Sequence, residues 1–249
     1  MAQKKRVCLS LLEKNEGLAR LLAQELVKAG LEVEAHFYEP KSWAACANAL
    51  TSCQAWIIAG DDFAKRELRT SLSLTALSVQ AELGHNFPIL ISSAQALEVS
   101  TLPTPLKEAE VVKSGLGVKA CVRANTLKPK RTEYRLRPLD HLGLWFELGP
   151  SDSIWQGAFL ALGQREGSCV PIAHGVGIAG SIPEKCTLTF PVKGIKFQLN
   201  EIDCEGWGVK NELKPGVSYY LKVSDCPDLI CFGPFPETDE AELYTLVLN

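Results

Sequence analysis

The sequence predicts an α/β fold: a mostly parallel sheet covered by helices on both faces, in three α/β/α layers, with extra β-strands in the second half. Short apolar runs alternate with segments of helical periodicity up to about residue 92. Parallel strands require crossover connections of this kind. Beyond residue 95 the helical periodicity fades, and strand-like runs are separated by glycine and proline.

The first half is interpreted as strands joined by helices, which also fits a flavodoxin-like topology. The first strand is an apolar run at residues 6–12, after which Asn15 is placed to cap a helix and Gly30 to end it. Leu18, Leu22 and Leu26 recur within this helix at helical spacing. The other strands are predicted at residues 31–38, 54–60 and 87–92, and the other helices at about residues 42–50 and 64–83.

The second half is interpreted as mostly strands. Residues 111–124 are predicted to hold another strand, and residues 127–131 are predicted as a polar connector. Further strands are predicted at residues 134–137, 142–148, 169–173, 186–192, 195–199, 219–223, 229–231 and 244–248. Two arrangements fit this pattern: one domain over residues 1–249, or a flavodoxin-like domain at residues 1–125 followed by a β-rich domain at residues 132–249.

Composition narrows the classes of function. The net charge is −3 and basic residues form no long block, so neither a nucleic acid nor a membrane is expected as a partner. The chain has no run of about 18 apolar residues and no signal-peptide pattern, and we therefore expect a cytoplasmic protein. The nine cysteines show no Cys-x-x-Cys spacing, and no glycine-rich phosphate loop occurs. No metal and no cofactor are predicted.

Three segments carry a resemblance to a known family. Residues 169–177 read Cys-Val-Pro-Ile-Ala-His-Gly-Val-Gly, similar to a motif in the amidotransferase part of phosphoribosylformylglycinamidine synthase, a class I glutamine amidotransferase. Residues 144–159 resemble the strand that precedes this motif. Residues 229–237 resemble the closing strand and its Pro-His-Pro-Glu sequence, with Phe235 at the position of the catalytic histidine and Glu237 at that of the glutamate.

The same resemblance places the cysteine nucleophile of the family within residues 87–97. Anchoring the comparison on Gln95 puts Ile91 at the nucleophile position, next to Ser92, whereas anchoring it on Pro88 puts Ser93 there. Neither alternative supplies a cysteine, and the phenyl ring of Phe235 cannot accept a proton. The resemblance therefore implies a remnant site without glutaminase activity, and we do not expect an enzyme.

Three hypotheses of function follow. The first is a catalytically degenerate amidotransferase-like protein that acts as a binding or interaction module, with a larger synthase subunit or a small molecule as partner. The second is an active amidotransferase or hydrolase in which Ser93 attacks and His174 is the base. The third is a flavodoxin-like ligand-binding domain fused to a β-sandwich. If the family assignment is right, Ser93, His174 and Phe235 should surround one cleft.

Each candidate residue also has a purely structural interpretation. Ser92 and Ser93 follow a buried strand, where serines commonly cap the next helix. His174 is expected to hold a glycine-flanked turn. Glu237 begins an acidic stretch that suits the first turn of a short surface helix.

Overall fold

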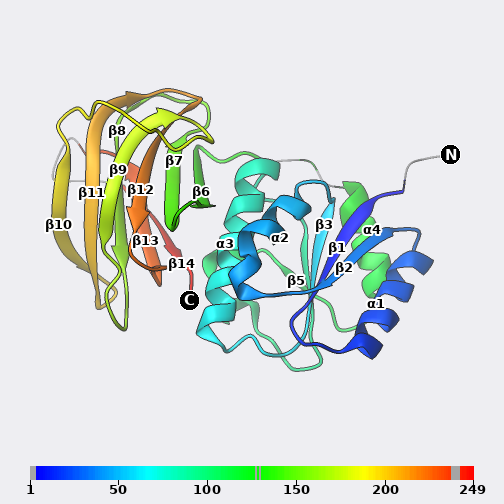
Figure 1. Ribbon diagram of the computed structural model, residues 1–249. Helices are drawn as coiled ribbons and strands as arrows, with labels where there is room; N and C mark the ends of the chain where they lie inside the picture. The colour runs from blue at the N-terminus through cyan, green and yellow to red at the C-terminus, as the bar shows by residue number, and fades with distance from the viewer. Residues whose placement is uncertain (1–3, 127, 129, 237–241) are drawn as a thin grey trace. The chain divides into compact units, whose positions relative to one another are not determined.

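The computed structural model describes residues 4–126, 128, 130–236 and 242–249. Its contacts divide the chain into two compact units, Met1–Lys130 and Arg131–Asn249. The strands of the first unit form one sheet, here sheet A, and those of the second form two further sheets, B and C (Figure 1). Within the described ranges, no helix combines the length and the apolar character needed to cross a bilayer.

Sheet A is parallel throughout, with the strand order β2-β1-β3-β4-β5. This is a flavodoxin-like order, in which the chain reverses its direction of travel between β1 and β3. The near-continuous apolar sequence of β1 and β3 follows from burial on both faces. The strands are β1 (Arg6–Leu11), β2 (Glu32–Phe37), β3 (Ala55–Ala59), β4 (Ile89–Ser92) and β5 (Glu110–Val111).

Helices cover both faces of sheet A, so the first unit has the predicted three layers. Alternate residues of a strand point to opposite faces. Leu9 therefore packs in the cluster that contains α1 and α4, whereas Cys8 packs in the cluster that contains α2 and α3. The helices are α1 (Glu16–Lys28), α2 (Trp43–Leu50), α3 (Arg66–Leu83) and α4 (Leu116–Thr126), with 3-10 turns η1 (Pro40–Ser42), η2 (Val99–Thr101) and η3 (Thr104–Leu106).

The second unit is a β-sandwich of two antiparallel sheets. Sheet B has the order β6-β7-β12-β9 and sheet C the order β10-β11-β8-β13-β14. Rings meet between the sheets, as where Tyr134 of β6 contacts Phe232 of β13 with centroids 4.8 Å apart. The strands are β6 (Tyr134–Asp140), β7 (Leu144–Pro150), β8 (Trp155–Gly163), β9 (Pro171–Ile178), β10 (Val192–Leu199), β11 (Ile202–Leu213), β12 (Val217–Val223), β13 (Leu229–Pro234) and β14 (Tyr244–Val247).

The prediction that residues 111–124 hold a strand is met only at Val111, the last residue of β5, because most of the range belongs to α4. Leu116, Ala120 and Ala124 are buried at helical spacing against sheet A. The β-branched residues that suggested a strand, such as Val118, lie on the solvent side of the helix.

The strand predictions of the second half failed at three places. Residues 186–191 are not a strand, and Phe190 has a left-handed backbone with φ 44°. Strands β8 and β11 were also missed. In β11, Gly206 and Gly208 interrupt the pattern, whereas the apolar run at residues 158–162 of β8 is continuous and was a usable strand signal. A Cβ on Gly206 of β11 would lie 2.3 Å from the ring of Phe159, so glycine is required there by a neighbouring ring.

The extra strands of the second half form sheets B and C, and none of those described pairs with sheet A. Extension of the parallel sheet by these strands is therefore not observed. Their hydrogen bonds are antiparallel, which short hairpin connections permit without crossover helices.

We expect Gly117→Ala to destabilise the first unit, because a Cβ there would lie 2.7 Å from the backbone oxygen of Glu25 in α1. Overpacking of this kind costs about 1 to 3 kcal/mol. Urea denaturation followed by circular dichroism measures the change. Val118→Ala, on the exposed side of the same helix, is the control and should be close to neutral; equal stabilities of the two variants would contradict the packing argument.

Candidate functional site

Two loops at the carboxyl ends of β3 and β4 bring Asp61 and Ser93 together. Ligands bind at this edge in flavodoxin-like folds. One oxygen of Asp61, Oδ1, accepts hydrogen bonds from Ser93 Oγ at 2.7 Å and from the N–H groups of Ala94 at 2.7 Å and Gln95 at 3.2 Å. The Ser93 hydroxyl, with the two backbone donors, holds the pKa of Asp61 below its ordinary value. Asp61 is thus a charged acceptor that organises the turn.

This arrangement gives Ser93 no base. Its hydroxyl donates to Asp61, a carboxylate with a lowered pKa and hence a poor proton acceptor at neutral pH. The predicted helix-capping role was also wrong, because the next helical segment is η2, which begins after Glu98. Ser93 Oγ instead accepts the N–H of Gln95 within its own turn, at 3.2 Å.

The neighbouring remnant positions are parts of the sheet. Ile91 is fully buried in β4 and belongs to the core between sheet A and helices α2 and α3. Ser92 ends β4 opposite Ala59 of β3. The strand-turn-helix elbow implied by the family resemblance is absent from the described residues that follow β4, which continue into 3-10 turns.

His174 lies in the middle of β9, opposite Leu221, and not in a turn as predicted. Its Nδ1 is 3.1 Å from the hydroxyl oxygen of Tyr219, and its ring meets Trp207 of β11 edge-on with centroids 4.9 Å apart. Burial, together with the charge of Lys193, lowers the pKa of His174 to about 4. The imidazole is therefore neutral at physiological pH.

The glycines of the His174 motif have a packing explanation. The segment of residues 178–186, here called the strap, crosses the outer face of sheet B. A Cβ on Gly175 would lie 2.9 Å from Pro183 of the strap, and a Cβ on Gly177 would lie 3.0 Å from the same proline. Close approach of the strap thus requires glycine at both positions.

Phe235 lies on the opposite side of sheet C from His174. Its ring covers Gly208, where a Cβ would lie 2.8 Å from the ring. Trp207, which contacts His174, and Gly208 are consecutive in β11, so they face opposite sides of the sheet. Ser93 belongs to the other unit, and Glu237 lies outside the described residues. The described positions therefore do not gather His174 and Phe235 around one cleft.

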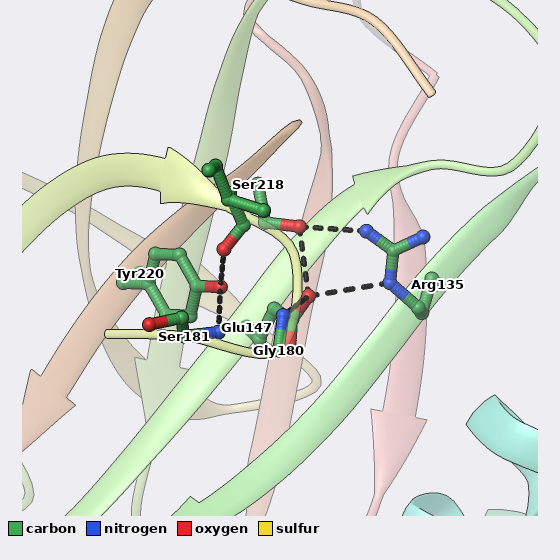
Figure 2. Close-up of polar contacts among 7 residues, drawn as sticks. Arg135, Glu147, Gly180, Ser181, Ser218 and Tyr220 are labelled. Carbon is green, nitrogen blue, oxygen red and sulfur yellow. Dashed lines mark hydrogen bonds and ion pairs between the residues drawn. The ribbon is translucent and has the colours of Figure 1, made fainter. Parts of the chain in front are cut away.

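A buried polar network on sheet B holds the strap in place (Figure 2). Glu147 of β7 is fully buried, and its Oε1 accepts hydrogen bonds from Ser218 Oγ at 2.8 Å, the N–H of Gly180 at 3.1 Å and Arg135 Nε at 3.3 Å. Arg135 Nη2 also donates to Ser218 Oγ at 2.7 Å. A buried charge is tolerated only with partners of this kind.

Tyr220 fixes the strap at a second place. Its hydroxyl accepts the N–H of Ser181 at 3.1 Å and donates to the carbonyl oxygen of Ile178. Burial, reinforced by the nearby Glu147 charge, raises the pKa of Tyr220 to about 12. The hydroxyl therefore remains protonated and able to donate at physiological pH.

A groove of about 600 Å³ opens in the second unit. Its lining comes from the connection between β8 and β9 (residues 164–170), from β10 (residues 196–198), from β11 (residues 203–205) and from Leu162 of β8. Since Asp203, Glu205 and Trp207 alternate along β11, they share the face that contacts His174. The volume is within the range of small-molecule sites.

Polar side chains dominate the groove. Asp203 accepts a hydrogen bond from Gln198 Nε2 at 2.9 Å, and Glu205 accepts one from Trp207 Nε1 at 3.3 Å. Gln164 Oε1 is shielded from solvent and has no hydrogen-bond partner among the described residues. Sequence reasoning missed these residues, although the alternation of Asp203, Glu205 and Trp207 was a usable signal for a strand with one polar face.

The described residues contain no cluster of His, Cys, Asp and Glu side chains suited to a metal ion. Cys8 and Cys46 approach His36, but they lie near different ring nitrogens, at 3.7 and 3.6 Å. One metal ion could not bind both thiols and a single nitrogen of that ring. Burial also raises the pKa of both thiols, which disfavours the thiolate that metals bind.

Comparison with known proteins adds little. No protein-family model matches the chain, and no curated protein matches its sequence. A solved structure of a 3-dehydroquinate dehydratase-like protein from Bifidobacterium longum is similar over 51% of this chain and 99% of its own length, at 17% sequence identity and a TM-score of 0.37. A likeness this distant carries no argument about chemistry.

We expect Glu147→Ala to destabilise the second unit by about 1 to 3 kcal/mol, because it removes the buried acceptor shared by Ser218, Gly180 and Arg135. The side chain of Arg135 is 22% exposed, so water replaces part of the lost partner. Hydrogen exchange of sheet B amides measures the change separately from the first unit. The control is Tyr244→Phe, which removes an exposed hydrogen bond to Glu133 and should cost no more than about 1 kcal/mol. Equal hydrogen-exchange protection of the sheet B amides in the two variants would contradict the stabilising role of the Glu147 network.

We expect the second unit to lose stability as the pH falls from about 6.5 to about 4, the interval between the ordinary and the folded pKa of His174. In this window the unfolded chain binds a proton that the folded chain does not, so acid favours unfolding. Hydrogen exchange against pH measures the loss, and His174→Gln should reduce it. An NMR titration in which His174 protonates near its ordinary pKa would contradict this expectation.

Proposed function

We propose that this chain is a non-catalytic binding module, in which a flavodoxin-like unit is joined to a β-sandwich that takes a small polar ligand in its groove. The observation that carries the proposal is the groove of about 600 Å³, whose lining residues include Gln164, and the buried Oε1 of Gln164 has no hydrogen-bond partner among the described residues. A buried acceptor without a partner costs free energy. Such groups are rare in folded proteins and call for a physical explanation.

The state of the candidate catalytic groups supports the same proposal. The Ser93 hydroxyl donates a hydrogen bond to Asp61, and burial together with the charge of Lys193 lowers the pKa of His174 to about 4. A nucleophile needs a base within hydrogen-bond reach. The recorded partners of Ser93 are Asp61 and Gln95, neither of which is suited to that task.

The amidotransferase resemblance offers a narrower form of the proposal, a degenerate relative that acts beside a larger synthase subunit. Its support is the sequence of residues 169–177. Three observations weigh against it: sheets B and C share no described strand with sheet A, the glycines of that motif accommodate Pro183, and His174 and Phe235 lie on opposite sides of sheet C. The fusion of a flavodoxin-like unit with a β-sandwich fits these observations better.

NMR titration of the full chain with a fragment library of neutral, anionic and cationic compounds tests the proposal. We expect the largest amide shifts at residues 164–170, 196–198 and 203–205, because these segments form the groove. Shifts confined to the turn around Asp61, or no binding at all, would refute the groove as the ligand site.

A parallel assay tests the non-catalytic part. The purified protein should release no ammonia from glutamine and should hydrolyse no ester or amide substrate above background. Turnover that disappears in both Ser93→Ala and His174→Ala would overturn the proposal and support an altered hydrolase site.

A further inference from the structure

We infer that the groove recognises an uncharged, polyhydroxylated ligand of the saccharide class. This inference rests on the proposed function and specifies the ligand of the same site. Three features of the groove support it: its charges, its hydrogen-bonding capacity and its small apolar surface.

The charges of the groove cancel. Arg165 and Lys196 are positive and Asp203 and Glu205 are negative, and all four line the groove. An anionic ligand is attracted by the two basic residues and repelled by the two acidic ones. A cationic ligand is attracted by the acidic residues and repelled by the basic ones. The groove therefore offers little net attraction to an ion, while its polar groups remain available for hydrogen bonds.

The hydrogen-bonding capacity of the groove suits hydroxyl groups. A carboxylate can accept about four hydrogen bonds, and one is recorded from a side chain for each of Asp203 and Glu205. Lys196 and Arg165 are donors without acceptor capacity. A hydroxyl both donates and accepts, so a ring bearing several hydroxyls can satisfy both kinds of group.

Gln164 provides a specific partner for one of these hydroxyls. Its Oε1 has no hydrogen-bond partner within the described part of the chain. This oxygen is shielded from solvent, so ligand binding requires the amide to rotate toward the groove, and the terminal torsion of a glutamine is soft enough to allow it. A ligand hydroxyl that donates to this oxygen removes the cost of leaving it unsatisfied.

The apolar surface of the groove is small. Among its apolar lining residues, Leu162 is almost fully buried, Phe197 is partly exposed and Val170 is 38% exposed. A sugar ring presents C–H groups on its faces and hydroxyls around its edge, which matches a small apolar surface among polar side chains. An aromatic or aliphatic drug-like ligand would instead leave most of the polar wall unpaired.

NMR titration of the full chain with glucose, galactose, mannose and N-acetylglucosamine tests the inference. At least one should shift the amides of residues 164–170, 196–198 and 203–205 at millimolar concentration. Glucosamine and glucuronate, which carry an ammonium and a carboxylate on a related ring, should bind no more tightly than the best neutral sugar. Added salt should leave the affinity for the neutral sugar unchanged.

Two matched variants, one at Gln164 and one at Gln156, test whether Gln164 contacts the sugar. Gln164→Leu, just after β8, should weaken sugar binding about tenfold, the loss of one hydrogen bond. Gln156→Leu, at an exposed position of β8 outside the groove, should leave binding unchanged. Equal effects of the two variants would overturn the assignment of Gln164.

The outcomes separate this inference from the proposed function. If fragments of another class bind in the groove and no neutral sugar does, the saccharide inference is overturned and the binding module stands. If nothing binds in the groove, both fail. A trisaccharide of the best hexose that binds more tightly than the monomer indicates a glycan chain, whereas equal affinities indicate a free sugar; both results retain the inference.

Discussion

The alternation of side chains along β11 is the constraint on which the organisation of the second unit depends. Consecutive residues of a strand face opposite sides of its sheet. Trp207 therefore faces sheet B and meets His174, while Gly208 faces the other side and admits the ring of Phe235. The same alternation places Glu205 beside Trp207 and gives the groove its acidic wall.

Many glycines of the sandwich lie where a neighbouring segment or side chain comes too close to the backbone for a Cβ atom. Gly175 and Gly177 leave room for the strap, and Gly206 and Gly208 leave room for aromatic rings. A sequence motif can thus be similar to that of a catalytic family because the backbone must pass a neighbour closely, and not because the chemistry is shared. In this chain the glycines beside His174 have such a neighbour in Pro183.

The polar clusters of the molecule differ in how completely their hydrogen bonds are made. Asp61 has several donors and organises an exposed turn, and Glu147 anchors the strap through one oxygen while its Oε2 has no partner among the described residues. Gln164 Oε1 is likewise without a partner among the described residues, but Gln164 lines an open volume of about 600 Å³. The open volume, and not the unsatisfied oxygen alone, therefore separates the groove from the network at Glu147.

The sequence by itself determined the strands and helices of sheet A as far as β4, because apolar runs and caps are local signals. Asn15, for example, caps α1 by accepting the N–H of Leu18 at 3.0 Å. Only the tertiary structure decided which strands share a sheet, which side of sheet C faces His174 of sheet B, and which polar residues line the groove. Those relations depend on pairing between strands that are far apart in the sequence. The energy of such pairing depends on both strands, so the residues of one segment do not predict it.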